Sequence, residues 1–265
     1  MKCEGQLVVI TGGGHGIGRG LAHRFAQEGA RHVAVIDLDG EAAHSVASEC
    51  CINQCKGSGH QADVGNRTQL LDCIDRIVEP HGPIDMFFSN AGIGVGGGLD
   101  TDDATWQKLW NVNVHSHIWA AQAVIPSMIE RGGGTIISTA SAAGLLTNIG
   151  AFPYAVTKHA AVAVAEWLSV TYGDNGIQVA CLCPMGVETQ LLDDSGELQA
   201  LLRPGALSVD AVVDATMAGI ETGTFLILPH GEVSKFMRHK ASDPDRWLGS
   251  MRTLQKHLGL GPSKG

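Results

Sequence analysis

The stretch Thr11-Gly-Gly-Gly-His-Gly-Ile-Gly18 directly follows the apolar run 7–10 and leads into the amphipathic segment 17–28. Glycines let the backbone turn sharply and approach a ligand closely, and the first turn of a helix offers free N–H groups and a positive dipole to phosphate groups. The stretch therefore predicts a strand, a phosphate-binding loop and a helix in succession. Its spacing is G-x3-G-x-G, and an ordinary loop between strand and helix is the alternative interpretation.

Short apolar runs alternate with longer amphipathic segments along the whole chain. Continuous apolar strands that alternate with helices are typical of a parallel sheet covered on both faces. We therefore expect an α/β fold, a single doubly wound (Rossmann) domain over residues 1–265, with a parallel seven-stranded sheet and helices on both faces. Strands are expected at 7–10, 32–36, 59–62, 84–88, 135–138, 177–183 and 225–228, and helices at 17–28, 40–53, 67–81, 105–131, 154–172 and 209–222.

The composition argues against a nucleic-acid or membrane partner. The formal net charge is -9 and only 17% of the residues are charged, whereas binding to nucleic acid relies on clustered Lys and Arg. The residues before the first apolar run leave no room for a charged leader, and the apolar segment 160–170 carries Glu166 and is too short to span a bilayer. We therefore expect a cytoplasmic protein.

The cysteines predict neither a disulfide framework nor a metal site. Their number, seven, is odd, and we expect reduced thiols. Cys50, Cys51 and Cys55 are close in sequence but lack the paired C-x2-C spacing and the histidine partners of a zinc site.

An acidic residue, Asp37, follows the second predicted strand. Dinucleotide-binding folds place an acid at this point to bind the ribose hydroxyls. A carboxylate accepts hydrogen bonds from both hydroxyls and repels a 2'-phosphate, and the next residue, Leu38, carries no compensating charge. The sequence therefore predicts NAD as the cofactor. A turn residue at the end of the strand is the alternative for Asp37, and a neutral loop histidine is the alternative to a phosphate contact for His15.

Tyr154 and Lys158 are one helical turn apart, so we expect both side chains on the same face of a helix, with Ser141 upstream. A phenol ordinarily ionises near about pH 10, and a nearby cation favours the phenolate. We expect Lys158 to lower the pKa of Tyr154. The phenol could then take a proton from an alcohol while the alcohol carbon gives up hydride to a cofactor.

Taken together, the motifs resemble the classical short-chain dehydrogenase/reductase family over nearly the whole chain. The resemblance implies that Asn113, Ser141, Tyr154 and Lys158 are the catalytic residues. Asn113 would hold a water that links Lys158 to solvent, Ser141 would hydrogen-bond the substrate oxygen, and Lys158 would also bind the nicotinamide ribose. Asn111 is a less favoured candidate for the asparagine role, and Ser138 is interpreted as structural. The matching motifs are 11–18, 63–64, 90–92, 113, 141, 154 with 158, and 184–189.

The same resemblance assigns the cofactor contacts. Asp63 and Val64 would flank the adenine, and Thr189, aided by the backbone of Val187, would contact the nicotinamide carboxamide. The complete set implied is Gly12, Gly14, His15, Gly16, Ile17, Gly18, Asp37, Leu38, Asp63, Val64, Asn90, Ala91, Gly92, Tyr154, Lys158, Pro184, Gly186, Val187 and Thr189.

One motif departs from the family pattern. The family usually has Pro-Gly after the sixth strand, whereas this chain has Pro184-Met185-Gly186. The glycine is displaced by one position, which leaves the local backbone geometry open. Met185 would either point at the substrate or be an ordinary buried methionine.

The substrate side of the site is predicted to be apolar. The resemblance makes the segment 187–205 a lid, in which Leu198, Leu201 and Leu202 follow i, i+3, i+4 spacing. Residues 230–265 form a C-terminal extension that packs on the core or on another subunit. The candidate pocket residues, each of which could equally belong to the core, are Ile93, Leu145, Ile149, Phe152 and Met185; with Ser141 and Tyr154, Ile93 and Met185 are the predicted substrate contacts.

These observations predict an NAD-dependent alcohol dehydrogenase/ketoreductase that interconverts a hydrophobic secondary alcohol and its ketone, with alcohol oxidation favoured by mass action. There are two alternatives: a reductase of an activated keto or enoyl substrate, and a regulator that binds NAD without turnover. The resemblance also implies a homodimer or homotetramer formed through the helices that carry Asn113 and Tyr154.

Overall fold

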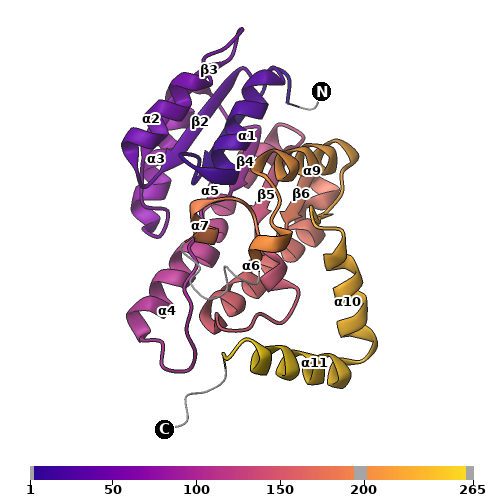
Figure 1. The fold of residues 1–265 in the computed structure, drawn as a ribbon. Coiled ribbons are helices and arrows are strands. Elements are labelled where there is room, and N and C mark those ends of the chain that lie inside the picture. The colour runs from indigo at the N-terminus through magenta and orange to yellow at the C-terminus, as the bar shows by residue number, and fades with distance from the viewer. Residues whose placement is uncertain (1–2, 194–201, 261–265) are drawn as a thin grey trace.

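The structure, a computed structural model, describes residues 3–193 and 202–260. Its centre is a parallel seven-stranded sheet with the strand order β3-β2-β1-β4-β5-β6-β7 (Figure 1). The predicted doubly wound fold is confirmed. The strands are β1 Leu7–Thr11, β2 His32–Asp37, β3 Lys56–Gln61, β4 Met86–Ser89, β5 Gly134–Thr139, β6 Ile177–Leu182 and β7 Leu226–Ile227.

Helices cover both faces of the sheet because each face has its own cluster of buried apolar side chains. The first cluster joins the sheet to α3 (Arg67–His81), α5 (Ser116–Glu130) and α6 (Phe152–Tyr172). The second joins it to α1 (Gly16–Gln27), α2 (Gly40–Glu49) and α9 (Val209–Thr222). The central strand β1 is buried along its whole length, which explains its continuous apolar sequence.

The predicted helix 105–131 is interrupted. The chain forms α4 (Asp103–Trp110), then a π-helical turn, η1 (Asn111–His115), and then α5. Single π-helical turns inside α-helices occur frequently at functional sites. Apolar periodicity does not distinguish this turn from regular helix, because all three segments continue along one helical path.

The remaining elements lie mostly in the second half of the chain. Helices α10 and α11 form the C-terminal extension, at the lower right in Figure 1. No helix in the described ranges is long and apolar enough to cross a membrane. The bounds are η2 Ala142–Gly144, η3 Gly173–Asn175, α7 Gln190–Asp193, η4 Arg203–Gly205, α10 Glu232–Ser242 and α11 Pro244–His257.

Several predicted boundaries are wrong by a few residues. Helix α2 ends at Glu49, and Asn53, the predicted end, has φ 54, which a right-handed helix does not allow. Strand β3 begins at Lys56, before the predicted residue 59, because backbone pairing with β2 extends through polar and glycine residues. Strand β7 has only two residues and pairs with β6 alone.

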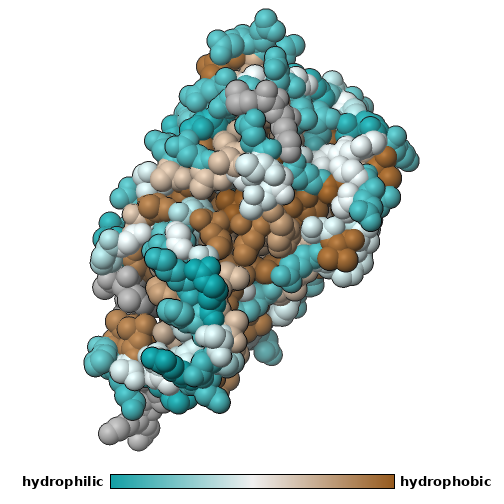
Figure 2. Space-filling view, turned by 90° about the vertical axis from the view of Figure 1, so that its right-hand side faces the viewer, coloured by the Kyte–Doolittle hydropathy of each residue, from teal (hydrophilic) through white to brown (hydrophobic). Residues whose placement is uncertain are grey.

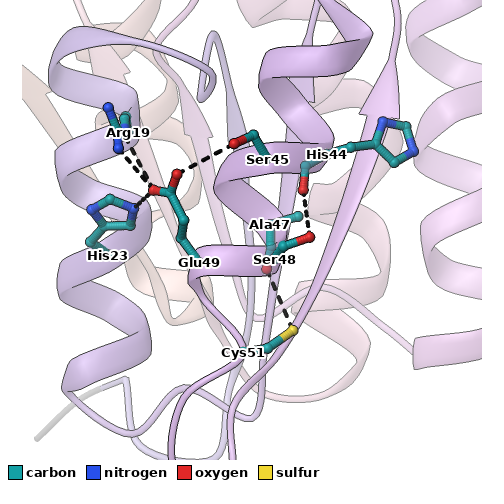
Figure 3. Close-up of polar contacts among 8 residues, drawn as sticks. All are labelled: Arg19, His23, His44, Ser45, Ala47, Ser48, Glu49 and Cys51. Atoms are coloured by element: carbon teal, nitrogen blue, oxygen red, sulfur yellow. Dashed lines mark hydrogen bonds and ion pairs between the residues drawn. The ribbon is translucent and has the colours of Figure 1, made fainter.

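A polar network fixes α1 to α2 (Figure 3). Glu49 at the end of α2 accepts a hydrogen bond from Arg19 Nη2 at 3.0 Å, and His23 Nε2 lies 2.6 Å from the same carboxylate oxygen. The hydrogen bond from Arg19 lowers the pKa of Glu49. At the other end of α2, Asp39 caps the helix by accepting from the Ala42 N–H at 3.1 Å. The network therefore holds α1, which opens from the glycine-rich loop, against the helix that follows β2.

The buried His32 makes stability sensitive to acid. Its ring stacks on His81 at 3.8 Å, and its Nε2 lies 2.8 Å from Ser58 Oγ. Burial, followed by the positive charges of neighbours, lowers the pKa of His32 from 6.5 to about 4. The unfolded chain therefore takes up this proton first as the pH falls.

We predict that the free energy of unfolding decreases between pH 6.5 and 4, by up to about 1.4 kcal/mol per pH unit from this group. His32→Gln should reduce that slope in urea unfolding measured across this pH range. His257→Gln, at an exposed histidine of α11, is the matched control and should leave the slope unchanged. Equal slopes for wild type and His32→Gln would contradict the prediction.

Candidate active site

The glycine-rich loop lies between β1 and the N-terminus of α1. Gly12 has φ +62, and a Cβ there would lie 2.8 Å from Ala91 Cα. A Cβ at Gly18 would lie 2.1 Å from the Gly12 carbonyl oxygen, so the loop packs too tightly for a side chain at either of these two positions. His15 is the exposed N-cap residue, and within the described ranges no side chain caps the first turn. The free N–H groups of that turn fit a diphosphate.

The acidic residue after β2 lies against this loop. Asp37 Oδ2 accepts from the Gly14 N–H at 2.8 Å, and Oδ1 accepts from the Asp39 N–H at 3.0 Å. A Cβ at Gly14 would lie 2.9 Å from Oδ2, so glycine is required for this approach. Leu38 is 67% exposed. The arrangement places a partly exposed carboxylate beside the phosphate loop, where ribose hydroxyls could reach it.

The predicted adenine residues follow β3. Asp63 Oδ1 accepts from the Gly65 N–H at 2.8 Å, and Val64 is buried. The turn after β3 lies at the carboxyl end of the sheet, the same end as Asp37, since the strands are parallel.

Asn90 joins the carboxyl ends of three strands. Its Nδ2 donates to the carbonyl oxygens of Thr11 and Gly12, both at 3.1 Å, and its Oδ1 accepts from Thr139 Oγ1 at 3.1 Å. Its backbone N–H donates to Thr11 Oγ1 at 3.0 Å. These bonds hold the phosphate loop, β4 and β5 together, so the role of Asn90 toward a cofactor is indirect in this structure.

Lys158 is a buried cation at the same end of the sheet. Its side chain is 3% exposed, and Nζ donates to the Thr139 carbonyl oxygen at 3.0 Å. Burial lowers the pKa of Lys158 to about 8. A Cβ at Gly92 would lie 3.1 Å from Nζ, so the backbone after β4 passes directly over the ammonium.

Tyr154 lies one turn before Lys158, and the Lys158 ammonium is 5.7 Å from the centre of its ring. The expectation that Lys158 lowers the pKa of Tyr154 is wrong for the protein groups alone. Burial raises the pKa of Tyr154, and a hydrogen bond with Ser141 opposes that rise. Desolvation disfavours the phenolate, and the ammonium is directed to the Thr139 carbonyl.

Ser141 and Ser138 take different places. Ser141 is 8% exposed and follows β5; its Oγ donates to the Pro184 carbonyl oxygen at 3.4 Å, accepts from the Ala143 N–H at 3.1 Å, and lowers the pKa of Tyr154. Ser138 is fully buried within β5. The structure therefore brings Ser141 to Tyr154 and keeps Ser138 inside the sheet.

Asn113 is fully buried in the π-helical turn. Its Oδ1 accepts from the Ile93 N–H at 2.9 Å, and its Nδ2 donates to the Ile93 carbonyl oxygen at 3.0 Å and to Thr157 Oγ1 at 3.1 Å. The competing Asn111 instead bonds Gln107, whose Nε2 donates to its Oδ1 at 2.8 Å. Asn113 thus joins the chain after β4 to α6, whereas Asn111 contacts α4.

The loop after β6 contains the displaced glycine. Within it Pro184, Gly186 and Val187 are buried, and Met185 is partly buried. The backbone of this loop is bound by His230, a buried residue that the sequence interpretation did not include. Only its position after the last predicted strand could have indicated it. Thr189 Oγ1 donates to the Val187 carbonyl oxygen at 3.2 Å. The Thr189 methyl group is 3.0 Å from a Cβ built at Gly16, so this segment reaches the phosphate loop.

The apolar pocket candidates do not all line one surface. Ile93, Leu145 and Met185 are partly buried, whereas Ile149 is only 9% exposed and Phe152, 43% exposed, packs edge-on against Trp106. Leu191 of α7 approaches Gly94, as the Tyr154 ring does. Of the predicted lid leucines, Leu198 and Leu201 lie outside the described residues.

The C-terminal extension packs on the loop that follows Ser141. Lys240 Nζ donates to the Leu145 carbonyl oxygen at 2.8 Å, and Trp247 Nε1 donates to Thr147 Oγ1 at 2.9 Å. The extension therefore packs on the loop that follows Ser141 in the same chain, as expected if it packs on the core.

No group of three or more His, Cys, Asp or Glu side chains in the described part of the chain is arranged to hold a metal ion. All seven cysteines lie in the described ranges and are free thiols. Cys181 and Cys183 approach each other with 3.7 Å between sulfurs beneath the site.

Comparisons with known proteins agree with this geometry. Residues 6–200 match the family model described as short chain dehydrogenase. The 17-beta-hydroxysteroid dehydrogenase 13 of Rattus norvegicus is 31% identical over 256 residues, covering 95% of this chain and 83% of that protein. The 3beta-hydroxysteroid dehydrogenase 2 of Eggerthella lenta is 34% identical over 190 residues, covering 71% and 73%.

A solved structure extends the similarity to the whole chain. It is a short chain dehydrogenase/reductase from Burkholderia phymatum in complex with NAD, with a TM-score of 0.82 and 26% identity, covering 100% of this chain and 99% of that one. The chain therefore belongs to the short-chain dehydrogenase/reductase family. It is an oxidoreductase of the kind that uses a nicotinamide cofactor and acts on small molecules.

The contact between Gly92 and Lys158 gives a direct test of the site. We predict that Gly92→Ala lowers oxidoreductase activity by about tenfold or more, because its Cβ would displace the ammonium by a few tenths of an ångström. Gly96→Ala is the matched control, since its Cβ would meet only the Gly150 carbonyl oxygen at 3.5 Å. Steady-state kinetics together with thermal unfolding would separate activity from stability. Full activity in Gly92→Ala would contradict the placement of Lys158 in the site.

Proposed function

We propose that the protein is an NAD-dependent oxidoreductase that interconverts a hydrophobic secondary alcohol and its ketone, with Tyr154 as the acid/base. The observation that carries this proposal is the cluster in which Ser141 lowers the pKa of the Tyr154 phenol and the Lys158 ammonium lies 5.7 Å from the centre of its ring. The cluster lies at the end of the sheet where the glycine-rich loop and Asp37 also lie.

In the oxidation direction, Ser141 hydrogen-bonds the substrate oxygen and Tyr154 takes the hydroxyl proton. When bound, a nicotinamide ring would supply the hydride acceptor, and its positive charge would favour the phenolate that burial alone disfavours. The Lys158 ammonium lies 5.7 Å from the centre of the phenol ring, and the Thr139 carbonyl keeps it in place. Asn113 supports the arrangement by fixing Ile93 and Thr157 on either side.

Asp37 favours NAD over NADP. Its carboxylate already accepts from Gly14 and Asp39, which aims its charge at the space beside the phosphate loop. A 2'-phosphate there would be repelled, and the exposed Leu38 offers no cation to offset the repulsion. The NAD named for the similar structure from Burkholderia phymatum supports this choice.

The partly buried Ile93, Leu145 and Met185, with Leu191 of α7, favour an apolar substrate. The hydroxysteroid dehydrogenases among its relatives support an apolar alcohol or ketone, and alcohol oxidation is the favoured direction in the cytoplasm, where we place the protein. We also propose that residues 187–205 act as the lid within a single domain.

The surface supports a homodimer or homotetramer. Trp167 and Val170 of α6 are 59% and 86% exposed, although the opposite side of that helix packs on the sheet. Figure 2 shows further apolar side chains in the middle of the face on which α9 and α10 lie.

The role of Tyr154 is tested by removing its hydroxyl. Tyr154→Phe should lower kcat by about 10²-fold or more, the contribution expected of a general acid/base. It should still bind NADH, because the phosphate loop and Asp37 are untouched. Tyr172→Phe, on the same helix with its ring against Trp167, is the control and should retain activity. Normal turnover of a secondary alcohol by Tyr154→Phe would refute the proposed mechanism.

The cofactor preference is tested by the double variant Asp37→Ser/Leu38→Arg. We expect the ratio of kcat/KM with NADP to that with NAD to rise by at least about tenfold, because arginine replaces a repulsive charge with a phosphate ligand. Asp39→Asn should leave this ratio unchanged, since asparagine still caps α2. A wild-type preference for NADP in a screen of secondary alcohols would overturn the assignment of NAD.

A further inference from the structure

His230 is a buried polar residue for which the proposed mechanism has no role. It lies between β7 and α10 and is 3% exposed. Its Nδ1 accepts from the Met185 N–H at 3.2 Å, and its Nε2 is 3.0 Å from the Gly186 carbonyl oxygen. One imidazole thus binds two peptide groups of the Pro184-Met185-Gly186 loop, the one before Met185 and the one after Gly186.

The two partners determine the protonation of the ring. A backbone N–H only donates and a carbonyl oxygen only accepts. Nδ1 must therefore be unprotonated and Nε2 must carry the proton. The contacts select one neutral tautomer, and either the other tautomer or the imidazolium would lose the bond to Met185.

The same loop joins two parts of the site. The Gly186 carbonyl oxygen also accepts from the Leu207 N–H at 3.0 Å, and the Glu188 N–H donates to the Leu207 carbonyl oxygen at 3.0 Å, so the start of the proposed lid is paired with the segment that follows the lid. On the other side, the Pro184 carbonyl oxygen accepts from the Ala142 N–H at 2.8 Å, next to Ser141. The loop therefore connects the residue that holds the substrate oxygen to the base of the lid.

We propose that His230 is a positioning residue that fixes the Met185–Gly186 backbone for cofactor binding. This inference rests on the proposed function, because it assigns the purpose of the loop to the nicotinamide cofactor. It also explains how the chain accommodates the displaced glycine. The Met185 N–H donates to the imidazole of His230, and this bond keeps a non-glycine residue at this position in a defined conformation.

The test compares three variants at a temperature where each is folded. His230→Leu removes both hydrogen bonds, whereas His230→Gln keeps one acceptor and one donor on its amide. His32→Leu is the matched control. It removes a histidine that is 4% exposed and bound to Ser58, at the opposite end of β2 from Asp37.

The measurements are the dissociation constant of NADH, the hydrogen-exchange rate of the Met185 amide, and the midpoint of urea unfolding. We expect His230→Leu to weaken NADH binding by about tenfold, as for the loss of one net hydrogen bond at the site. In His230→Leu, hydrogen exchange at the Met185 amide should be faster than in wild type. For both the NADH dissociation constant and this exchange rate, His230→Gln should give values between those of His230→Leu and wild type. His32→Leu should lower the unfolding midpoint and leave the other two measurements unchanged.

The proposal is overturned if His230→Leu has the same NADH dissociation constant and the same Met185 exchange rate as wild type. It is also overturned if His32→Leu changes these two quantities as much as His230→Leu does. A long-range ¹H–¹⁵N NMR spectrum of the wild-type protein gives a test that needs no variant. A protonated Nδ1 in His230 would contradict the assignment. Failure of wild type to bind NADH would refute the proposed function, and the exchange and tautomer measurements, made without cofactor, would still decide the contacts of His230.

Discussion

The buried ammonium of Lys158 is the constraint on which the site depends. A charge removed from water is costly unless strong polar partners surround it, and burial lowers its pKa to about 8. Its partner is the Thr139 carbonyl at the end of β5, and Gly92 passes close above it. This placement requires α6 to pack tightly on the sheet, which its small and β-branched buried residues allow. The cation therefore fixes the distance between the helix that carries Tyr154 and the strand ends where a cofactor is expected.

Parallel strands bring the rest of the site to the same edge. The order of the strands in the sheet reverses between β1 and β4: β2 and β3 lie on one side of this point, and β5, β6 and β7 on the other. Doubly wound sheets bind ligands at this position. Asn90 spans this point by bonding Thr11, Gly12 and Thr139. The glycine-rich loop, Asp37 and the Ser141 turn are consequently positioned by one sheet, although they are far apart in sequence. The C-terminal helices add a further support by bonding the loop after Ser141.

The sequence predicted the features that depend on local pattern. Continuous apolar runs identified most of the strands, and the glycine spacing located the loop between β1 and α1, because both signals are confined to a few residues. It did not predict the raised pKa of Tyr154, since desolvation depends on everything packed around a group and not on its i+4 neighbour. The π-helical turn at Asn113 was missed because it preserves apolar periodicity. His230 was missed because its partners lie 44 and 45 residues away in sequence. The displaced glycine of the Pro184-Met185-Gly186 loop is understood only with that contact in view.

The site is built around the Lys158 ammonium, which is buried beside Tyr154. The most direct test is to titrate the ε-methylene carbon of this lysine by ¹³C NMR, with Lys158→Met to assign the signal. We expect a titration near pH 8, the value to which burial lowers the pKa of this amine. A midpoint near about 10.4, that of a lysine in water, would contradict it.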